Sequence, residues 1–162
     1  MTPLHQAMLT QAVSGQLLSV RDVSQFSAAE IRQTMADLVA ANRIDLANAL
    51  AAAGQSLYSE SEDILAISAL LAEIQQDWTT AEELLRKLVD TQGAAATPFT
   101  WRHLIRVLRC QCEPGKALQV AHQAMLAHPT DTTLNDEFLA LQELVSEQVP
   151  VAASTQMHRA PS

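Results

Sequence analysis

Apolar residues recur at helical spacing in a succession of short segments that turn residues separate. The clearest segment follows Ser27, where Ile31, Met35 and Leu38 fall on one face of a helix. Ser27 stands three residues before Glu30, and this spacing predicts a capping box, in which each side chain accepts a hydrogen bond from the other residue's backbone N–H. The pattern therefore predicts an amphipathic helix that begins directly after Ser27.

The same criterion predicts a chain of short helices and indicates no strand. The first is a weak helix over 6–20, with Leu9, Val13, Gln16 and Leu17 near one face. We expect Gly54 to end a helix or to allow close packing, and residues 113–115 to break the helical pattern at Pro114. The other predicted helices span 27–40, 44–53, 61–75, 79–89, 98–110, 116–127 and 133–146.

Residues 98–129 carry a more specific pattern. An aromatic residue and two leucines are spaced along the first helix, small residues follow in the second, and a proline closes the unit, as Trp101, Leu104, Leu108, Ala117, Ala124 and Pro129. This arrangement resembles the tetratricopeptide repeat family, whose units begin W-x2-L-G-x2-Y and close with a proline. Ile105 stands where the family has glycine, and Ala121 stands where it has an aromatic residue.

The small residue of the second helix recurs along the chain. Ala47 and Ala81 are 34 residues apart, which is the family's period, and Ala81 and Ala117 are 36 apart. The loop 93–96 would hold the two extra residues. A small side chain at this position lets the second helix of a unit approach the first closely. The resemblance covers about residues 28–131, or three units.

The predicted fold class is therefore all-α: a right-handed α-solenoid of about three tetratricopeptide-like helix-turn-helix units, with an N-terminal helix and a C-terminal capping helix. The alternative is an irregular bundle rich in alanine and leucine. We expect an N-terminal helix and linker over 1–26, the repeat domain with its capping helix over 27–148, and a disordered tail over 149–162.

The resemblance implies a concave groove, lined by the first helix of each unit, that receives a peptide. Arg102, Arg106 and Arg109 lie at i, i+4 and i+7, so one helix face presents three cations suited to carboxylates. They are similar to the carboxylate clamp of some family members, which use lysine and asparagine instead. The predicted groove residues are Arg32, Ala36, Ala66, Leu70, Glu73, Phe99, Arg102, Arg106 and Arg109.

Two other interpretations of these residues remain open at this point. The arginines are equally consistent with a solvated face that is paired to neighbours such as Glu73, since charge stripes are usually surface. The N-terminal helix is a second alternative, because it would pack against the groove residues or occupy the groove itself.

Charge and composition narrow the class of partner. The net charge of -8 argues against nonspecific DNA binding, which needs a basic footprint. The N-terminus lacks the features of a signal peptide, and no stretch of 18 apolar residues occurs. We therefore expect a cytoplasmic protein with no nucleic-acid or membrane partner.

The sequence offers no catalytic or cofactor-binding motif. Cys110 and Cys112 lack the second ligand pair of a structural zinc site, and we expect their thiols to be buried. We find no catalytic residues, no metal site and no cofactor site, so an enzyme is not expected.

The expected function is a protein-interaction module, a scaffold or adaptor that binds a peptide or protein in its groove through an acidic segment or a C-terminal carboxylate. The size, charge and layout also resemble the chaperones of bacterial type III secretion, which commonly dimerise, so a homodimer is an alternative. A regulatory subunit of an enzyme is the third hypothesis.

Overall fold

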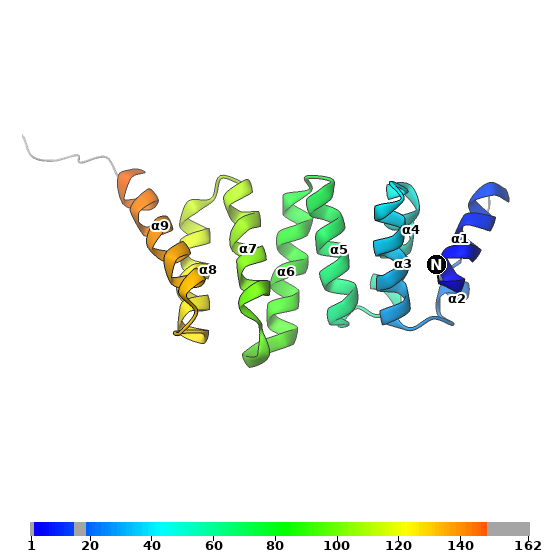
Figure 1. Ribbon diagram of the computed structural model, residues 1–162, viewed down its shortest axis with the longest axis horizontal. Coiled ribbons are helices and arrows are strands. Elements are labelled where there is room, and N and C mark those ends of the chain that lie inside the picture. Colours follow the sequence, from blue (N-terminus) through cyan, green and yellow to red (C-terminus); the bar gives the residue numbers. More distant parts are fainter. Residues whose placement is uncertain (1, 15–18, 149–162) are drawn as a thin grey trace, which may run out of the picture.

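The structure, a computed structural model, describes residues 2–14 and 19–148. Within these ranges the chain is helical, and its helices succeed one another along one direction (Figure 1). Their bounds are α1 Pro3–Ser14, α2 Val20–Val23, α3 Ala28–Ala40, α4 Ile44–Leu57, α5 Glu62–Ile74, α6 Trp78–Gln92, the 3-10 helix η1 Gly93–Ala95, α7 Pro98–Cys110, α8 Pro114–Ala127 and α9 Thr132–Gln148.

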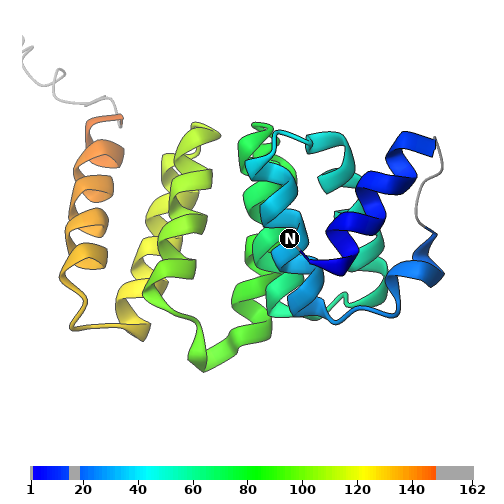
Figure 2. The ribbon, with the colours of Figure 1, turned by 45° about the vertical axis from the view of Figure 1, so that its right-hand side comes forward.

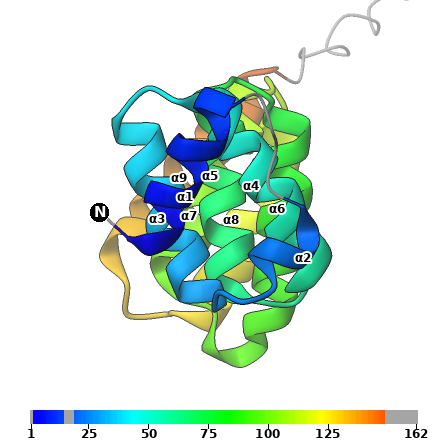
Figure 3. The ribbon, with the colours of Figure 1, turned by 90° about the vertical axis from the view of Figure 1, so that its right-hand side faces the viewer.

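The helices form two layers. Viewed along the long axis, α3, α5 and α7 lie on one side, and α4 and α6 lie on the other (Figure 3). Consecutive helices pack as pairs, α3 with α4, α5 with α6 and α7 with α8, and α9 packs on α8. This stacking confirms the predicted right-handed α-solenoid of three helix-turn-helix units, with a helix before the first unit and a capping helix after the last.

The repeated alanine explains how each pair closes. Ala47, Ala81 and Ala117 are each 0% exposed. They stand in the first turn of α4, α6 and α8, where a larger side chain would separate the two helices of the unit. In the capping helix, Leu134 and Leu141 are buried against the preceding unit. Most other positions of that helix are exposed and polar, as the end of a solenoid requires.

Three helix ends repeat the same turn, which the sequence analysis did not detect. Asn42, Gln76 and Cys112 follow the first helix of each unit, and all three have positive φ angles, of 56°, 60° and 58°. The next backbone N–H donates to the carbonyl five residues earlier, from Arg43 to Leu38 in the first case (2.8 Å), as in a Schellman motif. None of the three is glycine, so the glycine signal for such a turn is missing.

The core continues through α5. Its residues divide between two clusters, one shared with α1–α4 and one shared with α6–α9. Ile64, Ile67 and Leu71 belong to the first cluster, and Leu65, Ala69 and Ala72 belong to the second. The position of α5 therefore couples the two halves of the solenoid.

The N-terminal region differs from the prediction. A single helix over 6–20 is wrong, because α1 ends at Ser14 and Ser19 has an extended backbone (φ -72°, ψ 155°) that caps the separate helix α2. Ser19 forms a capping box with Asp22, whose carboxylate accepts from the Ser19 N–H at 3.1 Å. Two residues of the predicted apolar face, Gln16 and Leu17, lie outside the described residues, and so does the side chain of Val13. The predicted disordered tail, 149–162, also lies outside them.

Helix α1 packs at the N-terminal end of the row, against α3 (Figures 1 and 2). Leu4 and Met8 are buried in the core cluster of the first half. Polar contacts hold the same interface: the hydroxyls of Thr2 and Thr34 are 2.5 Å apart, and His5 Nδ1 lies 3.6 Å from an Asp37 carboxylate oxygen.

Three further predictions concern the ends of helices at Ser27, at Gly54 and at residues 113–115. The capping box at Ser27 is confirmed, since the Glu30 carboxylate accepts from the Ser27 N–H at 2.9 Å. Gly54 does not end a helix but lies buried within α4, where it permits close packing. The predicted break at 113–115 is shorter than expected, because α8 begins at Pro114, a position where the missing N–H would be unpaired in any residue.

Candidate binding groove

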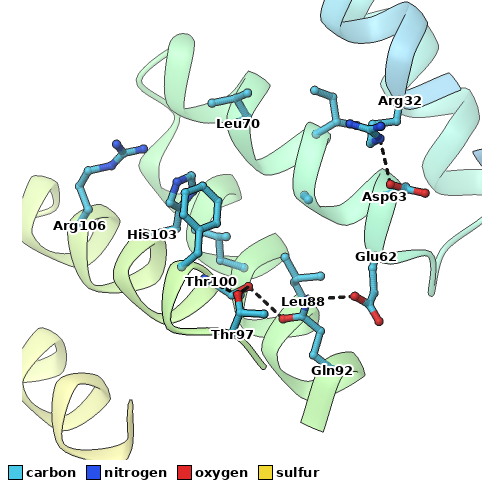
Figure 4. A pocket seen from close by; sticks show the side chains of 14 residues that line it. Arg32, Glu62, Asp63, Leu70, Leu88, Gln92, Thr97, Thr100, His103 and Arg106 are labelled. Atoms are coloured by element: carbon cyan, nitrogen blue, oxygen red, sulfur yellow. Dashed lines mark hydrogen bonds and ion pairs between the residues drawn. The ribbon is translucent and has the colours of Figure 1, made fainter. Parts of the chain in front are cut away.

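A pocket of about 560 Å³ opens on the face formed by the first helices. Leu85 and Leu88 of α6 form part of its lining and are themselves buried, at 2% and 4% exposure. Ala66 and Leu70 line it from α5, and Phe99 lines it from α7. Because α7 packs mainly on α6 and α8, the space between α5 and α7 is open (Figure 4). The centre of the pocket is therefore apolar and accessible.

Polar residues bridge α5 and α7 at one end of this pocket. The Thr100 hydroxyl donates to the Gln92 side-chain oxygen at 3.0 Å, and the Gln92 amide donates to the Glu62 carboxylate at 2.9 Å (Figure 4). The bridge therefore runs from the start of α7 through the end of α6 to the start of α5, and it places three polar side chains at that end.

An ionic bridge closes the other end. Arg106 Nη2 donates to Glu73 Oε2, and His103 Nδ1 lies 3.3 Å from Glu73 Oε1. Only 6% of the Glu73 side chain is exposed. Burial raises the pKa of the Glu73 carboxyl group, but the adjacent His103 and Arg106 side chains lower it by more, so its pKa lies below the ordinary value of 4.5. Glu73 is therefore a buried, negatively charged side chain that links α5 to α7.

We expect Glu73→Gln to lower the free energy of unfolding by about 1 kcal/mol at pH 6. A carboxyl group whose pKa is lower in the folded state stabilises the fold above its unfolded pKa, and that contribution is lost as the pH falls through the folded pKa. The difference between wild type and variant should therefore shrink between pH 6 and pH 3, as measured by urea unfolding. Glu143→Gln, on exposed α9 surface, is the control. A difference that is constant over this range would contradict the expectation.

A second hollow of about 400 Å³ lies beside the first, between α7 and α9. It shares Phe99, His103 and Arg106 with the apolar pocket, so these side chains of α7 form a ridge between the two. The Phe99 and His103 rings are 4.4 Å apart on this ridge. The remaining residues of the second hollow are Arg102, Arg109 and Glu137.

The predicted groove residues divide by their position. Arg32, Ala66, Leu70, Phe99 and Arg106 line the apolar pocket, and Arg32 pairs with Asp63 across α3 and α5 at 2.9 Å (Figure 4). Arg102, Arg106 and Arg109 line the second hollow, and Glu73 joins α5 to α7. Ala36 is the exception, because it is half-buried and packs on the core of the N-terminal half.

Sequence reasoning missed several polar residues of the two hollows, which are Glu62, Gln92, Thr97, Thr100, His103 and Glu137. His103 was within reach of a pattern argument, since it follows Phe99 by four residues and must share its helix face. Glu62, Gln92 and Glu137 gave no such signal, because each meets its partner only through the packing of different helices.

The interpretation of the arginines as surface groups paired to neighbours describes two of the three. Arg106 pairs with Glu73, and Arg109 Nη1 donates to Glu137 Oε1 at 2.8 Å. The N-terminal helix α1 does not line either hollow, since it lies at the far end of the row against α3 (Figure 1).

The thiols differ from the prediction. Cys110 and Cys112 are both free and exposed, so the expected burial is wrong. Cys110 lies on the face of α7 opposite its buried residues, and Cys112 occupies the left-handed turn, whose side chain points to solvent. Among residues 2–14 and 19–148, no group of three or more His, Cys, Asp or Glu side chains is arranged to hold a metal ion.

No helix in the described ranges has the length and apolar character needed to cross a membrane.

Comparisons with known proteins agree with this architecture. No model of a known family matches the chain, and no curated protein matches it. Among solved structures, it is similar to YrrB, a TPR protein with an unusual peptide-binding site, with a TM-score of 0.57 and 18% identity over 76% of this chain and 70% of that one. It is also similar to Acl4, an assembly chaperone of RpL4, with a TM-score of 0.51 and 15% identity. That match covers 90% of this chain and 58% of the other. The stacked pairs, the recurring alanine and these likenesses together show that the chain has the tetratricopeptide-type helical repeat fold.

Proposed function

We propose that this protein is an interaction scaffold that binds a segment of a partner polypeptide in the groove across α5, α6 and α7. The observation that carries this proposal is the open apolar pocket. Leu70 and Phe99 at its rim are 39% and 62% exposed, and Ile74, one turn beyond Leu70, is 47% exposed. Exposed apolar groups that gather around a hollow mark an interaction site, whereas single exposed apolar residues do not.

The size and lining of the pocket suit side chains of a polypeptide. Its volume of about 560 Å³ lies within the range typical of ligand sites, and its polar groups stand at the two ends. A partner's bulky apolar residue would contact Ala66, Leu70 and Leu88, and an acidic group would face the arginines of α7. The peptide-binding site named for the similar YrrB structure supports a polypeptide ligand.

We expect Ala66→Trp to weaken binding at least about 100-fold, because the indole would fill the pocket that the partner's apolar residue needs. Peptides would be selected from a random phage-displayed library on the wild-type protein, and their dissociation constants would be measured by fluorescence anisotropy. Ala52→Trp is the matched control, since Ala52 is exposed on α4, in the other helix layer. Circular dichroism would verify that both variants remain folded.

Two results would contradict the proposal. One is a wild-type protein that enriches no peptide from the library. The other is a set of selected peptides that bind Ala66→Trp as well as they bind Ala52→Trp.

A second candidate is a chaperone for a client protein, because one of the similar structures is an assembly chaperone. This function uses the same groove and differs in its partner, which would be a newly made or secreted protein. A type III secretion chaperone that dimerises, and a regulatory subunit of an enzyme, remain narrower hypotheses. Light scattering tests the hypothesis of a type III secretion chaperone, since a strict monomer argues against a chaperone that dimerises.

A further inference from the structure

The three arginines on α7 differ in what they contact. Arg106 is held by Glu73, and Arg109 is held by Glu137 at 2.8 Å. Arg102 makes no ion pair or hydrogen bond with any residue of 2–14 or 19–148, and its Nε atom is buried without a hydrogen-bond partner among them. Arg102 is only half-buried and lines the hollow, so the other N–H groups of its guanidinium can still donate to an acceptor that enters there.

The charge of the hollow between α7 and α9 favours an anion as that acceptor. Three arginines and one glutamate line it, so the local balance is positive although the whole chain carries a net charge of -8. The apolar pocket between α5 and α7 has no such excess, because Arg32 and Arg106 are offset there by Glu62 and Asp63. A carboxylate therefore gains more from the α7–α9 hollow than from the apolar pocket.

Arg106 and Arg109 contribute less to this preference. Glu73 and Glu137 already offset the charge of these two arginines, so an incoming carboxylate that bonds their remaining N–H groups gains less. Displacing Glu73 would also leave that buried carboxylate without its arginine, which is unfavourable. Arg102 has no such partner to lose, so a carboxylate that pairs with it adds a new charge-assisted hydrogen bond.

We propose that Arg102 is the residue that gives the groove its specificity, by binding an aspartate or glutamate side chain of the partner segment. The inference rests on the proposed function. The partner segment crosses the ridge of Phe99 and His103, with a bulky apolar side chain between α5 and α7 and its acidic side chain between α7 and α9. Binding then requires both residues at a fixed spacing, and an apolar segment without the acid binds more weakly.

The test uses random peptides displayed with both ends fused, so that no free C-terminal carboxylate is present. Clones that bind the wild-type protein but not Ala66→Trp are sequenced. We expect them to share a bulky apolar residue and, at a fixed spacing from it, an aspartate or glutamate. One such peptide is then synthesised with an amidated C-terminus, together with a version in which the acid is replaced by glutamine.

The affinities of both peptides are measured by fluorescence anisotropy against wild type, Arg102→Gln and the matched control Arg109→Gln. Arg102→Gln should weaken the acidic peptide roughly tenfold and leave the glutamine version unchanged, so that the two bind equally. Arg109→Gln should weaken the acidic peptide clearly less than Arg102→Gln does, because Glu137 already offsets the charge of Arg109.

The results separate the inference from the function on which it rests. If no clone depends on the pocket at Ala66, the proposed function itself fails. If pocket-dependent clones lack a shared acid, or if the acidic peptide keeps its advantage in Arg102→Gln, the role of Arg102 is overturned while the groove stands. An equal loss of affinity in Arg109→Gln also overturns the role of Arg102, because the arginines would then contribute equally to binding the acid.

Discussion

Replacement of Ile105 by alanine is expected to lower the free energy of unfolding by about 3 kcal/mol, within the usual range for removing a buried isoleucine. Ile105 is 0% exposed and belongs to the core cluster shared by α5–α9. Its loss removes three buried carbon atoms and leaves a cavity behind the face of α7 that carries the arginines. Urea unfolding followed by circular dichroism would measure the change.

The control for this prediction is Leu126→Ala, since Leu126 is 68% exposed on α8. That variant should stay within about 0.5 kcal/mol of wild type. Equal effects of the two substitutions would mean that the packing of α7 against its neighbours is not as described.

Gly54→Leu is expected to destabilise the fold by about 3 kcal/mol through overpacking. A Cβ atom at Gly54 would already lie 3.3 Å from Ile31 Cγ2 and 3.3 Å from Ile64 Cδ1, so the remaining leucine atoms have no space. Gly115→Leu is a matched control, because a Cβ atom there meets nothing within 4 Å. Thermal and urea unfolding of the two variants would give the comparison.

The Gly54→Leu substitution is also expected to change the geometry of the groove. Ile31 and Ile64 adjoin Arg32 and Asp63, the ion pair that links α3 to α5 beside the apolar pocket. Relief of the overlap would move α3 and α5 apart and weaken peptide binding in parallel with stability. A Gly54→Leu protein as stable as Gly115→Leu would show that α4 does not pack closely on α3 and α5 at Gly54.

The structure explains why one stretch of the solenoid carries an open pocket. Between α5 and α7 the packing is weaker than between the helices of a pair, so Leu85 and Leu88 of α6 become the lining of a pocket. The bridges at Glu62–Gln92–Thr100 and at Glu73–Arg106 hold α5 and α7 across that space. An apolar pocket thus stays open because its two ends are joined by polar contacts.

Local information in the chain was enough to predict the helices and their repeat. The capping box at Ser27, Pro98 at the start of α7 and the apolar period within each helix depend on residues a few positions apart. The recurrence of Ala47, Ala81 and Ala117 placed the units in register, because each small side chain serves the contact within its own pair. The same information failed near the N-terminus, where the apolar pattern predicted one helix over 6–20 although α1 ends at Ser14 and Ser19 has an extended backbone.

The partners of the groove charges depended on the tertiary structure. Glu73 and Arg106 are 33 residues apart, and Arg109 and Glu137 are 28 apart, so each pair forms only when different helices reach their final positions. Helical spacing places Arg102, Arg106 and Arg109 on one face and makes them look equivalent. Only the packing of α5 and α9 on either side of α7 makes them different, because it brings a carboxylate to two of them and leaves Arg102 unpaired.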